Sequence, residues 1–205
     1  PDNQDPSMIQ AAENVAQRYN ISRNDQDAFA LESHRKTIMA YKQKQLNQEI
    51  VSLEVKGEIF NRDESIKERM DERTLNRLKP LLTEGTVTAG NCCMKNDGAV
   101  LLLVMNKAMA EAYGIQQGLT FKDGITVGVD PTLLGIGPVP AVNTLLKRNK
   151  HTIDELDAIE LNEAFASQVL ASQRELGISL NKLNIYGGAI ASGHPYGASG
   201  AALVT

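Results

Sequence analysis

A run of glycines near the end of the chain constrains the possible fold more than any other feature of the sequence. Five of the 16 glycines lie within residues 187–200, after a short apolar segment and before a run of small residues. Glycine permits positive φ angles and lets other groups approach the backbone closely. We therefore expect a tight corner from a strand into a helix. The run lacks both the GxGxxG pattern of dinucleotide-binding folds and the Gly-Lys-Ser/Thr of phosphate-binding loops.

His194 lies inside this corner, directly before Pro195. Because proline suits the first turn of a helix, we expect His194 near a helix N-terminus, where the helix dipole disfavours an imidazolium. A neutral imidazole there could donate a hydrogen bond to a developing oxyanion, or accept a proton from a thiol. The alternative is that His194 is only a polar cap for the helix.

Charge and hydropathy exclude several classes of protein. The 205 residues carry a net charge of −4 with both signs well mixed and no basic stripe, so nucleic acid is not an expected partner. No apolar run approaches the roughly 18 residues that a membrane helix needs. The polar start, residues 1–6, contains no apolar core of a signal peptide. These features favour a cytoplasmic protein without a membrane partner.

The cysteines and histidines do not form a pattern that binds metal. Cys92 and Cys93 are adjacent, so that only a strained ring could join them, and no CxxC spacing is present. The three histidines, His34, His151 and His194, are scattered along the chain. We therefore expect neither a zinc site nor a structural disulfide, which fits a reducing compartment.

Periodicity and capping residues divide the chain into two parts of different texture. Residues 1–90 are rich in expected helices, whereas strands and helices alternate from about residue 98 onward. Alternation of this kind is typical of an α/β fold with a substantially parallel sheet, and we expect a boundary within residues 88–97. Expected helices or turns lie at residues 7–19, 22–46, 74–78, 137–150, 152–155 and 163–176, and a further helix is expected to start at Asp130-Pro131 with Asp130 as its N-cap. A capping box at Ser22 and Asp25 should open the second helix, and Gly177 should end the last one. Expected strands lie at residues 50–55, 99–105, 157–161 and 183–186, and a surface loop at residues 57–73.

Five motifs resemble those of the thiolase family and follow one another in the same order as in that family. The glycine run resembles the thiolase signature Gly-Gly-Ala-x-Ala-x-Gly-His-Pro, and collinear matches over nearly the whole chain are far more specific than any one motif. The motifs are AENVAQRYNISRNDQDAFALES at 12–33, GTVTAGN at 85–91 with NDGA at 96–99, LGIGPVPA at 134–141, NEAFA at 162–166 and YGGAIASGHPYGASGA at 186–201.

The resemblance implies roles for particular residues. His194 corresponds to the histidine that activates the nucleophile and binds the thioester oxygen, and Asn162 to the asparagine that holds a water in the same oxyanion hole. Without the resemblance, Leu134 and Phe165 are ordinary core residues, and Asn162 is a helix N-cap. Substrate-binding positions near the acyl group and the pantetheine arm fall at Ala89, Cys93, Leu134, Ala164 and Phe165.

The sequence also departs from the family pattern. Thiolases use two catalytic cysteines, in segments expected upstream of residue 1 and downstream of residue 205. Cys92 and Cys93 replace neither, since they stand where the family usually has Ala-Ser. Because the chain stops inside an apolar helical pattern at residues 201–205, we expect a fragment without turnover of its own.

The expected architecture is a partial thiolase-like αβαβα layered fold with a helix-rich loop domain. Residues 1–90 would belong to the loop domain that covers coenzyme A, residues 91–113 to the end of the N-terminal α/β domain, and residues 114–205 to a truncated C-terminal α/β domain. A partial fold would expose sheet edges, which favours a homo-oligomer or association with a missing thiolase half.

The resemblance implies an acetyl-CoA C-acetyltransferase that uses acyl-CoA as its substrate and needs no metal or separate cofactor. A ketoacyl synthase is a related alternative that NEAFA and GHPYGASG argue against. An alternative of another class is a non-catalytic thiolase remnant that binds coenzyme A or serves in oligomerisation.

Overall fold

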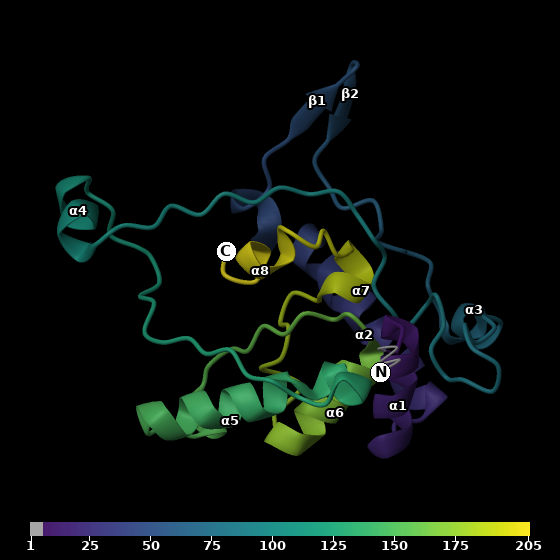
Figure 1. Ribbon diagram of the computed structural model, residues 1–205. Helices are drawn as coiled ribbons and strands as arrows, with labels where there is room; N and C mark the ends of the chain where they lie inside the picture. Colours follow the sequence, from purple (N-terminus) through teal and green to yellow (C-terminus); the bar gives the residue numbers. More distant parts are fainter. Residues whose placement is uncertain (1–5) are drawn as a thin grey trace.

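The computed structural model describes residues 6–205 and consists mainly of helices (Figure 1). Residues 1–6, in which no signal-peptide core was expected, lie almost wholly outside this range. The α-helices are α1 (Met8–Arg18), α2 (Arg23–Lys42), α3 (Glu72–Asn76), α4 (Lys107–Ala112), α5 (Pro138–Asn149), α6 (Ala166–Leu176), α7 (Ala189–Ser192) and α8 (Ser199–Ala202). The 3-10 helices are η1 (Gln45–Gln48), η2 (Pro131–Ile136) and η3 (Ile153–Glu155), and the strands β1 (Leu53–Val55) and β2 (Glu58–Phe60) form an antiparallel hairpin.

The helix starts follow local capping chemistry. Ser22 accepts a hydrogen bond from the Asp25 N–H at 3.1 Å while the Asp25 carboxylate accepts one from the Ser22 N–H at 3.2 Å, which confirms the capping box expected for α2. α2 ends at Lys42, four residues before the expected end at Leu46. Side chains of this kind satisfy backbone N–H groups that have no partner inside the helix, and therefore mark helix starts in the sequence.

The core forms around α6, which packs against α1, α2, α5 and η2. Leu170 and Ala171 of α6 join Val15 and Ala16 of α1 in one buried cluster. On another side of α6, a second buried cluster holds Val169, Leu176, Ile178 and Leu183. Burying such side chains contributes about 1.5–3 kcal/mol each. α6 is thus the element on which the segments of the site are assembled.

The start of α6 differs from the sequence-based expectation of a helix over residues 163–176. The helix begins at Ala166 with Phe165 as its N-cap residue, so Asn162 does not cap it. The reason is tertiary: Phe165 is extended, and residues 164 and 165 pair with a neighbouring segment instead of entering the helix. The helix ends at Gly177 in the left-handed conformation, as expected.

The expected parallel sheet is absent from residues 6–205. Ile159 and Leu183 form a single parallel bridge where two strands were expected, and β1 and β2 are the one paired sheet of the described chain. β2 lies in a segment that was expected to be a loop. Strands depend on partners distant in the sequence, so an apolar pattern alone does not produce one. No helix within the described range has the length and apolarity needed to cross a membrane.

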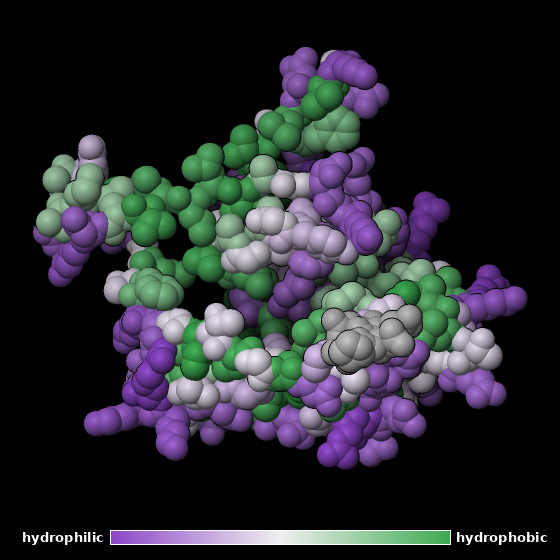
Figure 2. Space-filling view, viewed as in Figure 1, coloured by the Kyte–Doolittle hydropathy of each residue, from purple (hydrophilic) through white to green (hydrophobic). Residues whose placement is uncertain are grey.

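The apolar run at residues 99–105 was expected to be a strand buried on both faces. It is instead the extended first part of an exposed arm, residues 99–115, that also contains α4 (Figure 1). Leu101 is 94% exposed, and none of residues 99–105 belongs to a strand. Apolar surface follows this arm in Figure 2. The expectation was wrong because the described residues supply no adjacent strand and no helix to cover the arm.

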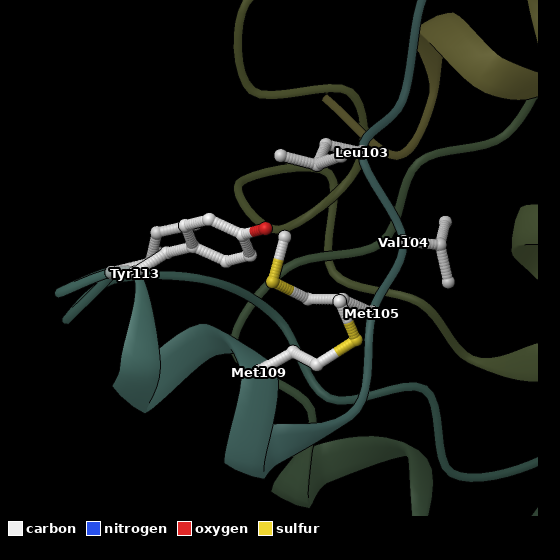
Figure 3. Close-up of a pocket in the computed structure, with 6 residues that line it drawn as sticks. Leu103, Val104, Met105, Met109 and Tyr113 are labelled. Atoms are coloured by element: carbon white, nitrogen blue, oxygen red, sulfur yellow. The ribbon is translucent and has the colours of Figure 1, made fainter.

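Near α4 the arm folds back on itself around a hollow of about 450 Å³. Figure 3 shows Met105, Met109 and Tyr113 gathered on one side of the arm, while Val104 points away from them. The arm therefore presents unpaired backbone and apolar side chains together. Surfaces with these two properties favour association with another polypeptide.

Another segment, residues 61–70, is held against α2. The His34 Nδ1 atom accepts a hydrogen bond from the Lys67 N–H at 3.3 Å, and Tyr41 Oη donates to the Asp63 carboxylate at 2.9 Å. Burial, and to a lesser extent the Lys67 charge, lower the pKa of His34 below its ordinary value. His34 is therefore neutral and an acceptor in the folded protein near pH 7.

We expect acid pH to weaken the protein through His34. Since the unfolded chain binds this proton more readily than the folded chain, stability is present at neutral pH and is lost as the pH falls below about 6.5. A His34→Asn variant keeps an acceptor but does not titrate. Its thermal midpoint should fall less than that of the parent chain between about pH 7.5 and about pH 5.5. The control His151→Asn, at an exposed position, should follow the parent, and equal slopes for His34→Asn and the parent would contradict the assignment.

Candidate functional site

An extended segment, Asn91–Lys95, joins the motifs singled out from the sequence. On one side its Cys93 N–H donates a hydrogen bond to the Ala164 carbonyl at 3.0 Å. Cys92 and Phe165 form an antiparallel bridge at the same place. The cysteine segment thereby holds Phe165 of the NEAFA motif in an extended conformation, so that α6 starts only at Ala166.

The same segment binds the glycine corner at its other end. The His194 N–H donates to the Met94 carbonyl at 2.9 Å, and Lys95 and His194 form a parallel bridge. Next to His194, Gly193 has a φ of +100°, and a Cβ atom at this position would collide with the Asn96 side chain. A glycine is therefore required for the corner to approach the segment this closely.

The position of the segment is set by Asn91, whose side chain is fully buried. Its Nδ2 donates to Asp27 Oδ1 at 2.9 Å and to the Thr86 carbonyl at 3.1 Å, and its Oδ1 accepts from the Thr88 N–H at 2.8 Å. Asp27 in turn pairs with Arg23 at 2.7 Å. Every polar group of Asn91 thus has a partner, which fixes the segment relative to α2.

The imidazole of His194 is held by a hydroxyl group rather than by a helix end. Its Nδ1 lies 2.7 Å from Ser199 Oγ, which also lies 3.1 Å from the Pro195 carbonyl. The expected helix start at Pro195 is wrong, because α8 begins at Ser199 and has only four residues. Burial, not a helix dipole, lowers the pKa of His194 and favours the neutral ring.

The position of one proton decides what His194 can do. When the Ser199 hydroxyl donates to Nδ1, the other ring nitrogen, Nε2, carries the proton and can donate to an oxyanion. When that hydroxyl donates to the Pro195 carbonyl, Nδ1 carries the proton and Nε2 can accept one from a thiol. Rotation of a single hydroxyl therefore permits both roles expected from the sequence.

The Asn91–Lys95 segment pairs with His194 directly, but on the other side it pairs with Ala164 and Phe165, which follow Asn162 in the sequence. Asn162 is partly buried two residues before Ala164, whereas His194 is bonded to Met94. Among residues 6–205 no hydrogen bond joins the two side chains.

The expected substrate-binding residues divide into two sets. Cys93, Ala164 and Phe165 are partly buried and meet at the extended segment, whereas Ala89 is exposed in the turn that precedes it. Leu134 is 47% exposed and lies in η2, which packs against α1 and α6. The contacts of the described residues therefore do not bring Leu134 to His194.

Sequence reasoning passed over Glu163, the residue between Asn162 and Ala164, which the structure buries almost completely. It is buried and accepts hydrogen bonds from Ser33, Asn184 and Ile190. Its place between an expected apolar strand and a buried helix was the available signal. A carboxylate in such a place is buried, and a buried carboxylate needs hydrogen-bond partners. Within the described range no group of three or more His, Cys, Asp or Glu is arranged to hold a metal ion.

Neither cysteine of the segment is prepared to act as a nucleophile. Burial, with smaller contributions from Cys92 and Glu163, raises the pKa of the Cys93 thiol to about 11. Burial also raises the pKa of Cys92. Reactive cysteines have a lowered pKa, because the thiolate is the attacking species.

We therefore expect slow alkylation of Cys93 in the folded chain. In a Cys92→Ser variant, which leaves one thiol, iodoacetamide should label Cys93 about two orders of magnitude more slowly at neutral pH than it labels a free cysteine. The rate is followed by intact mass. The same variant in urea is the control and should react at the ordinary rate; fast labelling of the folded variant would show an activated thiolate and contradict this assignment.

Comparisons with known proteins agree with the motif order and the fold. The profile of the thiolase N-terminal domain matches residues 3–108, and that of the thiolase C-terminal domain matches residues 116–205. A protein of Staphylococcus haemolyticus, provisionally named acetyl-CoA C-acetyltransferase VraB, is 62% identical over 204 residues, which cover 100% of this chain and 54% of that protein. The protein of the same name from Staphylococcus aureus strain COL is 58% identical over 205 residues and is also covered to 54%.

A solved structure of an acetyl-CoA acetyltransferase also matches this chain. The crystal structure of the Bacillus anthracis acetyl-CoA acetyltransferase matches with a TM-score of 0.92 and 35% sequence identity, over 96% of this chain and 51% of that chain. This chain therefore has part of the thiolase fold, and it spans about half the length of the relatives it matches. The match of two thiolase domains over nearly all its residues shows that the chain belongs to the thiolase family.

Proposed function

We propose that this chain supplies the oxyanion-binding part of a thiolase-type acyltransferase, with acetyl-CoA C-acetyltransferase as the activity of the whole protein. The observation that carries the proposal is the extended segment Asn91–Lys95, which binds the backbone beside Asn162 on one side and that of His194 on the other. The reaction would be Claisen condensation of acyl-CoA, or thiolytic cleavage of 3-ketoacyl-CoA.

His194 and Asn162 would stabilise charge on the thioester. When a thiolate adds to the carbonyl carbon, negative charge develops on the carbonyl oxygen, and preorganised donors lower the barrier to this step. His194 Nε2 would donate to that oxygen, and Asn162 would hold a water that donates to it as well. The neutral imidazole favoured by burial suits both donation and proton transfer.

The pantetheine and acyl group would lie along the extended segment. Ala164 and Phe165 would line the acyl end, with Cys93 and Ala89 nearer the pantetheine arm. Leu134 is assigned to the same pocket by family resemblance, and its exposed side chain in η2 leaves it free to contact a ligand. Coenzyme A enters this scheme as part of the substrate, and no separate cofactor is needed.

The attacking thiolate would come from outside these 205 residues, because the high pKa of Cys93 leaves it protonated. We assign residues 1–90 to the loop domain, residues 91–113 to the end of the N-terminal α/β domain and residues 114–205 to the C-terminal α/β domain. The exposed apolar arm would pack against the cysteine-bearing part of a thiolase or against another subunit. A cytoplasmic location suits a protein that works on acyl-CoA.

The second candidate is a non-catalytic remnant that binds coenzyme A or oligomerises. The inert thiols of Cys92 and Cys93 favour it, since these residues alone provide no activated nucleophile. The two functions differ in whether the carbonyl oxygen of a thioester is recognised.

We expect the 205-residue chain to bind acetyl-CoA, with His194 sensing its carbonyl group. In calorimetry, His194→Ala should weaken acetyl-CoA binding by about tenfold, because the variant loses one hydrogen bond to the thioester carbonyl oxygen. The same change should leave the binding of free coenzyme A unchanged, since coenzyme A has no such carbonyl. Asn162→Ala should show the same selectivity. The control His151→Ala, at an exposed position, should bind both ligands like the parent chain.

Three other results would reject parts of the proposal. Equal losses for acetyl-CoA and coenzyme A, or no binding of either by the parent, would favour the remnant. Acetoacetyl-CoA cleavage by the 205-residue chain that disappears in His194→Ala would show that an internal group can act as the nucleophile.

A further inference from the structure

Glu163 is a buried carboxylate whose role the oxyanion site does not explain. It is 1% exposed and lies between Asn162 and Ala164 in the NEAFA motif. Burying a charge is costly unless it is paired and hydrogen-bonded. The partners of this side chain therefore show what the fold gains from it.

Two helices and the loop that contains Asn184 donate hydrogen bonds to Glu163. Its Oε2 accepts from the Ser33 hydroxyl of α2 at 2.6 Å and from the Ile190 N–H of α7 at 3.1 Å. Its Oε1 accepts from Asn184 Nδ2 at 2.8 Å. All of these partners act as donors, which matches an ionised carboxylate, even though burial raises the pKa of Glu163.

The orientation of Asn184 is fixed independently of Glu163. Its Oδ1 accepts from the Leu161 N–H at 2.8 Å, and its Nδ2 donates to the Leu161 carbonyl at 2.9 Å. The amide therefore cannot turn around without losing both bonds. A glutamine in place of Glu163 has one oxygen and one NH₂ group, so either Asn184 or the Ser33–Ile190 pair would face another donor.

The glycine run is shaped around this carboxylate. A Cβ atom on Gly188 would collide with the Glu163 carboxyl group, and the Gly188 N–H donates to Ser33 Oγ at 3.2 Å. Gly188 is also the N-cap residue of α7. The start of this helix is therefore attached to Glu163 both directly, through Ile190, and through Ser33.

α7 is too short to maintain its own position. It has four residues, Ala189–Ser192, and a helix of one turn gains few internal bonds for the conformational freedom it loses. Gly193 and His194 follow directly. A displacement of α7 would thus be transmitted to the His194 backbone, while Asn162 is covalently next to Glu163 itself.

We propose that Glu163 is a positioning residue: its carboxylate holds α7, and through it His194, in a set place relative to Asn162. The functional meaning of this positioning rests on the proposed oxyanion role of His194 and Asn162. The hydrogen bonds that hold α7 do not depend on that role. The start of the glycine run, with Gly188, would then serve to hold His194 in place.

The test is an NMR titration of the His194 imidazole in the ligand-free 205-residue chain, with His194→Ala used to assign the signal. Burial lowers the pKa of His194 in the parent. If Glu163→Gln releases α7, the ring becomes more exposed and its pKa rises toward the ordinary value of about 6.5. Loss of a nearby negative charge alone would move that pKa down, so the sign separates positioning from a direct charge effect.

Glu160→Gln is the matched control, because Glu160 lies three residues earlier on the same segment and is exposed. It should leave the His194 titration unchanged. Ser33→Ala, which keeps the carboxylate and removes one donor, should raise the pKa of His194 by less than Glu163→Gln, and it remains informative if Glu163→Gln fails to fold.

A fall in thermal midpoint with an unchanged or lowered pKa of His194, in Glu163→Gln or in a folded Ser33→Ala, would overturn the proposal and leave Glu163 a residue of the core only. The acetyl-CoA experiment can fail without affecting this result, because the titration contains no ligand. The two proposals are therefore tested separately.

Discussion

The backbone pairing of Asn91–Lys95 is the interaction on which the rest of the site depends. Buried peptide groups need partners, and this segment satisfies its own by pairing with the NEAFA motif and with the glycine corner. Asn91 connects the segment to Asp27 of α2 and to the turn that contains Thr88. Stretches of chain that are separate in the sequence are thereby placed around one segment.

Local signals in the sequence predicted several helix ends correctly and the strands poorly. The capping box at Ser22, the N-cap at Asp130 and the stop at Gly177 were all confirmed, since each depends on neighbouring residues. The apolar run at residues 99–105 failed, because a strand needs partners that lie elsewhere. The same rule explains why Phe165 is extended rather than helical: pairing with Cys92 overrides the helical pattern.

The candidate site was predictable only in part. The resemblance to thiolases pointed to His194 and Asn162. The structure pairs one segment with His194 and with the residues that follow Asn162, while the chemical roles of both residues stay predictions. The reason first given for a neutral His194, a helix dipole, was wrong, and burial with a Ser199 contact takes its place. Glu163 escaped notice because its importance lies in donors from α2 and α7 that no spacing in the sequence reveals.

Hydrogen exchange tests the central claim most directly, because it measures each pairing of the Asn91–Lys95 segment separately. The amides of Cys93, Ala166 and His194 donate to Ala164, Asn91 and Met94, and they should exchange slowly and as a group. The amides of residues 101–105, which have no backbone partner within residues 6–205, should exchange fast. Exchange of Cys93 and His194 as fast as that of the arm would show that the segment does not join the two motifs, and would contradict the account.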